Sequence, residues 1–227
     1  MENKKKKELI LAIAMKKKNL ISIIQSTASF SNPRIELEQY CIDAISAVDI
    51  AYFAGFEFND IHKNLIIDLG TGTGRLSLAS SFFNPIKVIG IDLDWSAIQI
   101  FKKNIFHLEL QHLIYPICMD VSNLTLHRDF LLDEIQITTI MNPPFGVQRK
   151  RADRVFLMSA FTYSNVIYSI HLDHQDVFKF ITKFVGKNGW VIDYSFPFQM
   201  RLERSFPFHS KKMKEINVRI YRIIKQT

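Results

Sequence analysis

The sequence holds little of what metal sites, disulfides and membrane spans require. Its 227 residues include two cysteines, Cys41 and Cys118, and no cysteine or histidine stands in a metal-ligand spacing. So few thiols predict a reducing, cytoplasmic compartment, with neither a structural disulfide nor a bound metal. The longest apolar run near the N-terminus, residues 9–15, is far shorter than the roughly 20 residues that cross a bilayer, so no membrane partner is expected.

Glycine is also scarce, yet three of the 8 glycines fall close together. Gly70, Gly72 and Gly74 follow an apolar run at residues 65–67, and the residues after them favour a helix. Glycines at such a strand–turn–helix junction let the backbone turn tightly and approach a ligand closely. The spacing from Asp68, D-x-G-x-G-x-G, differs from the dinucleotide fingerprint and lacks the lysine of a P-loop. It resembles the first motif of class I S-adenosylmethionine (SAM)-dependent methyltransferases.

Polar side chains stand at the ends of the next predicted strands. The strand at residues 86–92 ends at Asp92, roughly 20 residues after the glycine turn, where an acid usually holds a ribose diol; Asp94 is the alternative. Asp120 ends the following strand, placed either to accept from an adenine amine or to cap a turn. Open parallel sheets bind ligands at the carboxyl ends of their strands, so one site is expected to gather four side chains: Asp68, Asp92, Asp120 and Asn142.

An Asn-Pro-Pro-Phe motif follows the β-branched run at residues 135–140. Pro143 and Pro144 have no N–H and a locked φ, so the chain leaves the sheet as a stiff loop with free carbonyls. Asn142 supplies an amide acceptor and Phe145 a flat face, which together suit a planar group with an exocyclic amine, such as adenine. Taken alone, the motif fits a proline-rich turn with a core phenylalanine equally well.

The net charge of +7 favours a polyanionic partner. Basic residues gather just after the Asn-Pro-Pro-Phe motif and near the C-terminus, where five nucleic-acid contacts are predicted: Arg149, Lys150, Arg151, Lys211 and Lys212. Residues 1–30 are predicted to form a basic, amphipathic helical extension, either a cap on the domain or a nucleic-acid arm. Residues 31–227 are predicted to form the main domain.

Alternating helix and strand patterns continue to residue 185 and contribute five predicted strands in all. Two final strands are expected at residues 189–196 and 215–224, as a hairpin beside those five. The link between them, residues 197–214, is rich in aromatic and basic residues and is predicted to be a long, functional loop.

The motifs together resemble the small-subunit ribosomal RNA adenine-N6 methyltransferases of archaea and eukaryotes, the methyltransferase-like-five group. The resemblance extends from about residue 30 to the end and is carried, in this order, by Leu37-Glu38-Gln39-Tyr40, Asp68-Leu69-Gly70-Thr71-Gly72-Thr73-Gly74, Gly90-Ile91-Asp92-Leu93-Asp94 and Asn142-Pro143-Pro144-Phe145-Gly146. The Leu37-Glu38-Gln39-Tyr40 segment is the motif specific to this family, because the glycine turn and Asn-Pro-Pro motifs occur in many methyltransferases. The resemblance implies an α/β, Rossmann-like class I SAM-dependent methyltransferase domain, with a seven-stranded, mostly parallel sheet and a C-terminal antiparallel strand.

SAM is the implied cofactor, with Gln39 closing over it from the N-terminal side. The implied cofactor contacts are Gln39, Asp68, Gly70, Gly72, Asp92, Leu93, Asp120 and Asn142. The implied catalytic segment, which presents the target adenine, is Asn142, Pro143, Pro144 and Phe145. The family usually has a threonine where this chain has Ile42, which puts one cofactor contact in question. Eukaryotic members also imply a small zinc-binding activator subunit as a partner.

The expected activity is transfer of a methyl group from SAM to the N6 amine of an unpaired or flipped-out adenine in RNA, with small-subunit rRNA as the substrate. Guanine-N2 RNA methyltransferases and protein-glutamine methyltransferases share the glycine turn and the Asn-Pro-Pro motif. The Leu37–Tyr40 segment argues against both. A catalytically dead RNA-binding scaffold of the same fold stays open because of Ile42.

Overall fold

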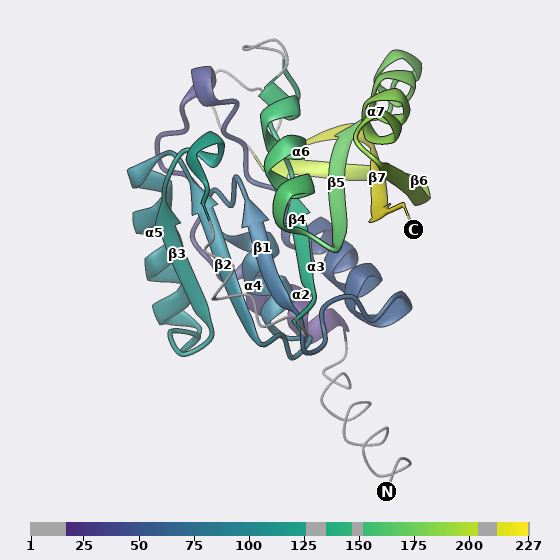
Figure 1. Cartoon of the computed structure of the whole chain (residues 1–227). Helices are drawn as coiled ribbons and strands as arrows, with labels where there is room; N and C mark the ends of the chain where they lie inside the picture. The colour runs from purple at the N-terminus through teal and green to yellow at the C-terminus, as the bar shows by residue number, and fades with distance from the viewer. Residues whose placement is uncertain (1–16, 126–134, 147–151, 204–212, 227) are drawn as a thin grey trace, which may run out of the picture.

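The computed structural model describes residues 17–125, 135–146, 152–203 and 213–226. One seven-stranded sheet runs through this part of the chain in the order β3-β2-β1-β4-β5-β7-β6 (Figure 1). The strands are β1 (Leu65–Leu69), β2 (Lys87–Asp92), β3 (Ile114–Cys118), β4 (Ile137–Met141), β5 (Val166–Leu172), β6 (Trp190–Glu203) and β7 (Met213–Lys225). Strands β1 to β5 pair in parallel, whereas β7 is antiparallel to both β5 and β6. The predicted class I methyltransferase fold is confirmed.

Helices cover both faces of the sheet (Figure 1). One face carries α2 (Lys17–Gln25), α3 (Ala44–Tyr52), α4 (Arg75–Ser81) and α5 (Trp95–His107), and the other carries α6 (Ala152–Tyr163) and α7 (Gln175–Lys187). Strand side chains alternate between the two layers, so Ile66 packs in the first core and Ile67 in the second. This burial on both faces explains why the strands are continuous apolar runs. Short helical turns complete the chain: η1 (Ile35–Leu37), η2 (Phe53–Glu57) and η3 (Val121–Asn123).

A largely buried polar cluster ties β5, β7 and β6, at one end of the sheet, to the loop before β1. Arg222 of β7 donates to both carboxylate oxygens of Asp60, from Nε over 2.7 Å and from Nη2 over 3.1 Å. The Tyr168 hydroxyl on β5 also donates to Asp60, and Arg222 reaches Asp193 on β6 as well. Asp60 and Arg222 are nearly buried, with side chains 11% and 13% exposed, so each charge depends on its partners.

The predicted loop at residues 197–214 is wrong over much of its length. Strand β6 continues to Glu203 and β7 begins at Met213, and the two pair along this whole extension. Phe196, Phe198 and Met200 alternate with exposed residues, which is the period-two pattern of a strand. Pro197 obscured that pattern, but β6 is an edge strand, where a missing N–H is tolerated.

Helix α2 lies within the predicted N-terminal helical extension, and residues 1–16 lie outside the described residues. Helix α2 buries Leu20 and Ile24 in the core beside α3 and α4. Ala28 then exchanges two hydrogen bonds with the side chain of Asn104 on α5. Of the helices in the described ranges, none is long and apolar enough to cross a membrane.

Candidate active site

The glycine turn after β1 has a backbone that only glycine suits. Gly74 has a φ of +92°, and a Cβ there would come within 1.9 Å of the Phe101 ring. Gly72 has a φ of +56° and faces Phe30, which a Cβ would approach to 3.2 Å. The turn therefore packs closely against α5 on one side and against the segment after α2 on the other.

Asp68 holds this turn from below. Its Oδ2 accepts from the Thr71 hydroxyl over 2.8 Å, and from both the backbone N–H and the hydroxyl of Ser77, at 3.0 and 2.6 Å. The side chain is buried, and burial raises the pKa of Asp68 to about 6 despite these three donors. Asp68 thus fixes the turn to the first residues of α4.

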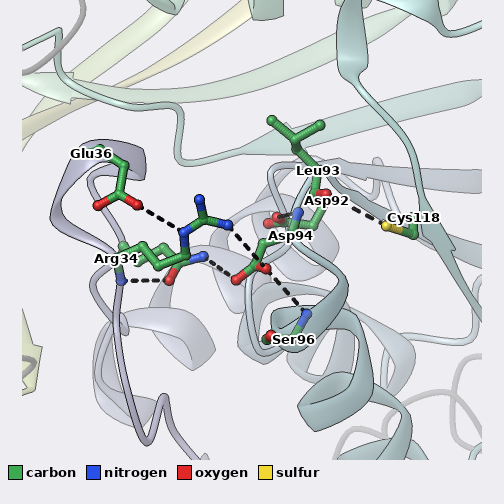
Figure 2. A network of polar contacts seen from close by, with 8 residues as sticks. Arg34, Glu36, Asp92, Leu93, Asp94, Ser96 and Cys118 are labelled. Carbon is green, nitrogen blue, oxygen red and sulfur yellow. Dashed lines mark hydrogen bonds and ion pairs between the residues drawn. The ribbon is translucent and has the colours of Figure 1, made fainter.

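Asp92 and Asp94 at the end of β2 have different surroundings (Figure 2). Asp92 accepts from the N–H of Gly72 over 2.8 Å and from that of Asp94 over 2.9 Å, and burial raises its pKa. Asp94 is the N-cap of α5 and accepts from the N–H of Ser96. Asp92 borders the cavity described below, whereas Asp94 does not.

Gln39 connects the loop before α3 to this acidic end of β2. Its Nε2 donates to Asp94 over 2.7 Å, while its Oε1 accepts from the N–H of Arg34 over 2.8 Å. The Arg34 guanidinium lies 3.7 Å from Asp94 as well (Figure 2). Residues 34–39 are in this way held across the end of β2, where they form one wall of the site.

A cavity of about 400 Å³ opens between this wall and the carboxyl ends of β1, β2 and β4. Pockets for small molecules commonly measure roughly 300–1,000 Å³. Eight of the predicted site residues border it: Gln39, Gly70, Gly72, Asp92, Leu93, Asp120, Asn142 and Pro144. Asp68, Pro143 and Phe145 do not border this cavity, although Phe145 borders a second one beside it.

Asp120 combines the two interpretations that the sequence left open. It is the N-cap of η3, where its Oδ1 accepts from the N–H and the hydroxyl of Ser122, at 2.8 and 2.7 Å. It borders the cavity at the same time. A capping aspartate therefore stands at the predicted position for a cofactor contact.

Tyr40 joins the two functional groups of the Asn-Pro-Pro-Phe motif. Its hydroxyl donates to Oδ1 of Asn142 over 3.3 Å, and its ring stacks on Phe145 with centroids 5.3 Å apart and planes inclined by 22°. Burial raises the pKa of Tyr40 well above its ordinary value, so the hydroxyl keeps its proton. Sequence reasoning included Tyr40 in a family motif but missed this role, and it missed Phe30 entirely.

Ile42, the departure from the family pattern, is buried and borders the cavity. Its backbone carbonyl accepts from Nη1 of Arg75 over 2.8 Å, and its backbone forms a bridge with Leu202 of β6. The one departure from the predicted family pattern is thus an apolar residue in the cavity wall.

The predicted nucleic-acid contacts fall outside the described residues: Arg149, Lys150, Arg151, Lys211 and Lys212. Both cysteines are free thiols, Cys41 buried and Cys118 exposed. In the described ranges, no cluster of three or more His, Cys, Asp or Glu side chains is suited to a metal ion.

Comparison with known proteins connects this geometry to a family. The model of the ribosomal protein L11 methyltransferase family (PrmA) matches residues 38–136, which stops before the Asn-Pro-Pro-Phe motif. A protein from Pyrococcus horikoshii, provisionally assigned as an RNA methyltransferase, has a crystal structure with a TM-score of 0.83 and 34% identity, covering 94% of this chain and 99% of that one. An uncharacterised protein from Methanocaldococcus jannaschii is 38% identical, over 93% of this chain and 95% of its own length.

The deciding relative is the rRNA N(6)-adenosine-methyltransferase METTL5 of Danio rerio, 32% identical over 90% of this chain and 96% of its own length. The chain belongs to the METTL5 family. The segment from Leu37 to Tyr40, on which the family resemblance was based, borders the cavity, and its Tyr40 contacts Asn142. Structures of the same fold include two with SAM bound, and at 15–16% identity that likeness concerns the fold alone.

Proposed function

We propose that this chain transfers a methyl group from SAM to the N6 amine of an unpaired or flipped-out adenine in RNA, with small-subunit rRNA as the substrate. One observation carries the proposal. The amide of Asn142 and the ring of Phe145, both engaged by Tyr40, stand at the end of β4 beside a cavity whose opposite wall holds Asp92. Methyl transfer from SAM to an adenine amine can use all three groups. The acid binds the ribose of the cofactor, the amide accepts from the adenine amine, and the aromatic face stacks on the adenine ring.

The residues around the cavity fit SAM, which supplies an electrophilic methyl group when bound. A carboxylate has about four acceptor positions, and the N–H groups of Gly72 and Asp94 fill two of those on Asp92, which leaves capacity for a ribose diol. Leu93 is 55% exposed beside it and offers an apolar surface to a base. We assign Asp120 to the adenine amine and the backbone of Gly70 to the methionine moiety.

Gln39 and Asp68 act indirectly in this proposal. Gln39 keeps residues 34–39 closed over the cofactor, through its bonds to Arg34 and Asp94. Asp68 is buried beneath the glycine turn and positions its backbone without touching the ligand.

Asn142 aims the nucleophile. The lone pair of the adenine amine is delocalised into the ring, so hydrogen bonds from N6–H to Asn142 Oδ1 and the Pro143 carbonyl favour a geometry in which that lone pair points at the methyl group. An amide oxygen has two acceptor positions, and the Tyr40 hydroxyl uses one of them and orients the other. A neutral amide is a poor base, so positioning supplies most of the acceleration.

Phe145 stacks on the target base, which must leave its helix to reach the site. Base–aromatic stacking contributes roughly 1–3 kcal/mol. The basic residues that follow the motif hold RNA phosphates in this proposal. A zinc-binding activator subunit is the proposed partner of this chain, and the cytoplasm is the proposed compartment.

Mass spectrometry of nucleosides tests the proposal. Small-subunit rRNA is incubated with the protein and SAM carrying an isotopically labelled methyl group, then digested completely. Labelled N6-methyladenosine is the expected product, whereas labelled N2-methylguanosine, or label found only in protein glutamine, would replace the proposal with one of those activities. SAM binding by calorimetry, without any labelled product, would indicate an inactive scaffold.

A further inference from the structure

A second cavity, of about 210 Å³, lies next to the first. It is bordered by Phe145, Asp153, His171, Leu172, Asp176, Val177 and Phe180. Residues 142–145 and the first turns of α6 each contribute to both cavities and separate them. Asn142 and Pro144 border the first and Phe145 the second, while on α6 Ala152 and Phe156 border the first and Asp153 the second.

Phe145 offers its open side to the second cavity. Tyr40 covers one face of the Phe145 ring and does not border this cavity, whereas Phe145 does. A base that stacks on Phe145 while Tyr40 stays in place must therefore lie on the side of the second cavity. Phe180 supplies a second aromatic wall there, with the Arg154 guanidinium 4.6 Å from its ring centre.

The polar groups of the second cavity suit a nucleobase better than a phosphate. Asp153 and Asp176 contribute carboxyl groups, and none of the residues that border the cavity in the described ranges is a lysine or arginine. His171 is 2% exposed, and burial lowers its pKa to about 3, so its imidazole is neutral. Its Nε2 pairs with the Ser169 hydroxyl over 2.6 Å, and no described residue hydrogen-bonds to Nδ1.

We propose that the second cavity is the pocket for the target adenine, between Phe145 and Phe180. The amine points back toward Asn142 and the first cavity, and the far edge of the ring faces His171. With the Ser169 hydroxyl donating to Nε2, Nδ1 carries the proton and donates to a ring nitrogen of adenine. This assignment rests on the proposed function and makes α7 a specificity element of the reaction.

Filling the cavity, or removing one of its aromatic walls, tests this directly. Val177 is half-buried at the edge of the cavity, so Val177→Phe occupies its volume, and Phe180→Leu removes the second aromatic wall. Phe178→Leu is the matched control, because Phe178 lies on the same helix but packs against Tyr221 and Arg219 outside the cavity. Steady-state methylation of rRNA, SAM affinity by calorimetry and thermal unfolding are measured for all three and for the wild type.

Val177→Phe is expected to lower kcat/KM for RNA at least tenfold, with SAM affinity within twofold of wild type. Phe180→Leu should raise KM for RNA severalfold, while Phe178→Leu leaves both parameters unchanged. If the wild type forms N6-methyladenosine and Val177→Phe forms it equally fast, the pocket assignment is overturned and the proposed function stands. If Val177→Phe does not fold, Phe180→Leu provides the test. A KM for RNA in Phe180→Leu equal to that of the wild type then overturns the assignment. Wild-type protein that forms no N6-methyladenosine overturns both.

Discussion

The Tyr40 hydroxyl donates a hydrogen bond to Oδ1 of Asn142 over 3.3 Å, between residues 102 positions apart in the chain. The same tyrosine stacks on Phe145, three residues after Asn142. The loop before α3 therefore contacts both the amide and the aromatic ring of the Asn-Pro-Pro-Phe motif. Under the proposed function, this makes the Leu37–Tyr40 segment part of the catalytic arrangement as well as a wall of the cofactor cavity.

Tyr40→Phe should reduce kcat while leaving SAM affinity nearly unchanged. The variant keeps the stack on Phe145 but loses the bond that orients the Asn142 amide. A net hydrogen bond contributes about 0.5–1.5 kcal/mol, which corresponds to a roughly two- to tenfold lower rate. Tyr194→Phe, an exposed tyrosine on β6, is the control. Equal single-turnover rates for Tyr40→Phe and wild type would show that this hydrogen bond does not contribute to the chemistry.

Asp92→Ala should weaken SAM binding at least tenfold. Hydrogen bonds to a charged group contribute about 1.5–3 kcal/mol, and the variant also releases the Gly72 N–H that Asp92 now accepts. Asp92→Asn retains an acceptor and should lose less affinity. Calorimetric titration with SAM measures both, with Glu57→Ala, an exposed acid in η2, as the control. Unchanged affinity in Asp92→Ala would remove the ribose assignment from this residue.

Asp68 should make stability depend on pH between about 4 and 6. Its pKa rises from 3.8 in the unfolded chain to about 6 in the fold, so the folded state binds more protons in that window. This contribution to the free energy of unfolding is fully present below pH 4 and is lost as the pH rises to 6, by up to about 3 kcal/mol. Asp68→Asn lacks it.

Urea unfolding of wild type and Asp68→Asn at pH 4, 5, 6 and 7 measures this effect. The variant should become more stable relative to wild type as the pH rises through the window. A constant difference between the two proteins at all four values would contradict the raised pKa.

Arg222→Met should lower the free energy of unfolding by about 3–5 kcal/mol, because it leaves the carboxylate of Asp60 buried without its cation. Arg201→Ala is the matched control. Its ion pair with Glu215 also joins β6 to β7, but the two side chains are 46% and 49% exposed, so the loss should stay below about 1 kcal/mol. Similar losses in the two variants would mean that the Asp60 cluster is not an anchor of the sheet.

The site could be predicted from the sequence where local pattern and strand order suffice. Gly70, Asp92 and Asn142 each stand directly after an apolar residue at a strand end, and parallel strands bring such ends to one edge. The pairing of Leu69 with both Ile91 and Met141 in the sheet register confirms that they meet there. The strand extension of β6 was missed because Pro197 interrupts its alternating pattern, and only its place at the sheet edge makes that proline harmless.

Contacts between distant segments could not be predicted in the same way. Neither the position of Tyr40 against Asn142 nor that of Phe180 near Phe145 leaves a periodic signal, since each depends on how the loop before α3 and helix α7 pack on the sheet. The burial of Asp68 is another example. The sequence predicts that Asp68 contacts the cofactor, but it does not show that the side chain is buried and that its Oδ2 accepts three hydrogen bonds from the glycine turn and α4.

The central claim is that Asn142 aims the adenine amine for methyl transfer, and the rate of one turnover in Asn142→Ala tests it most directly. Enzyme saturated with labelled SAM is mixed with rRNA, and the formation of N6-methyladenosine is followed over time. The variant should bind SAM like wild type and transfer the methyl group at least a few hundredfold more slowly, since an interaction made in the transition state is lost while cofactor binding is kept. A folded Asn142→Ala protein that forms N6-methyladenosine at a near-normal rate would contradict the account.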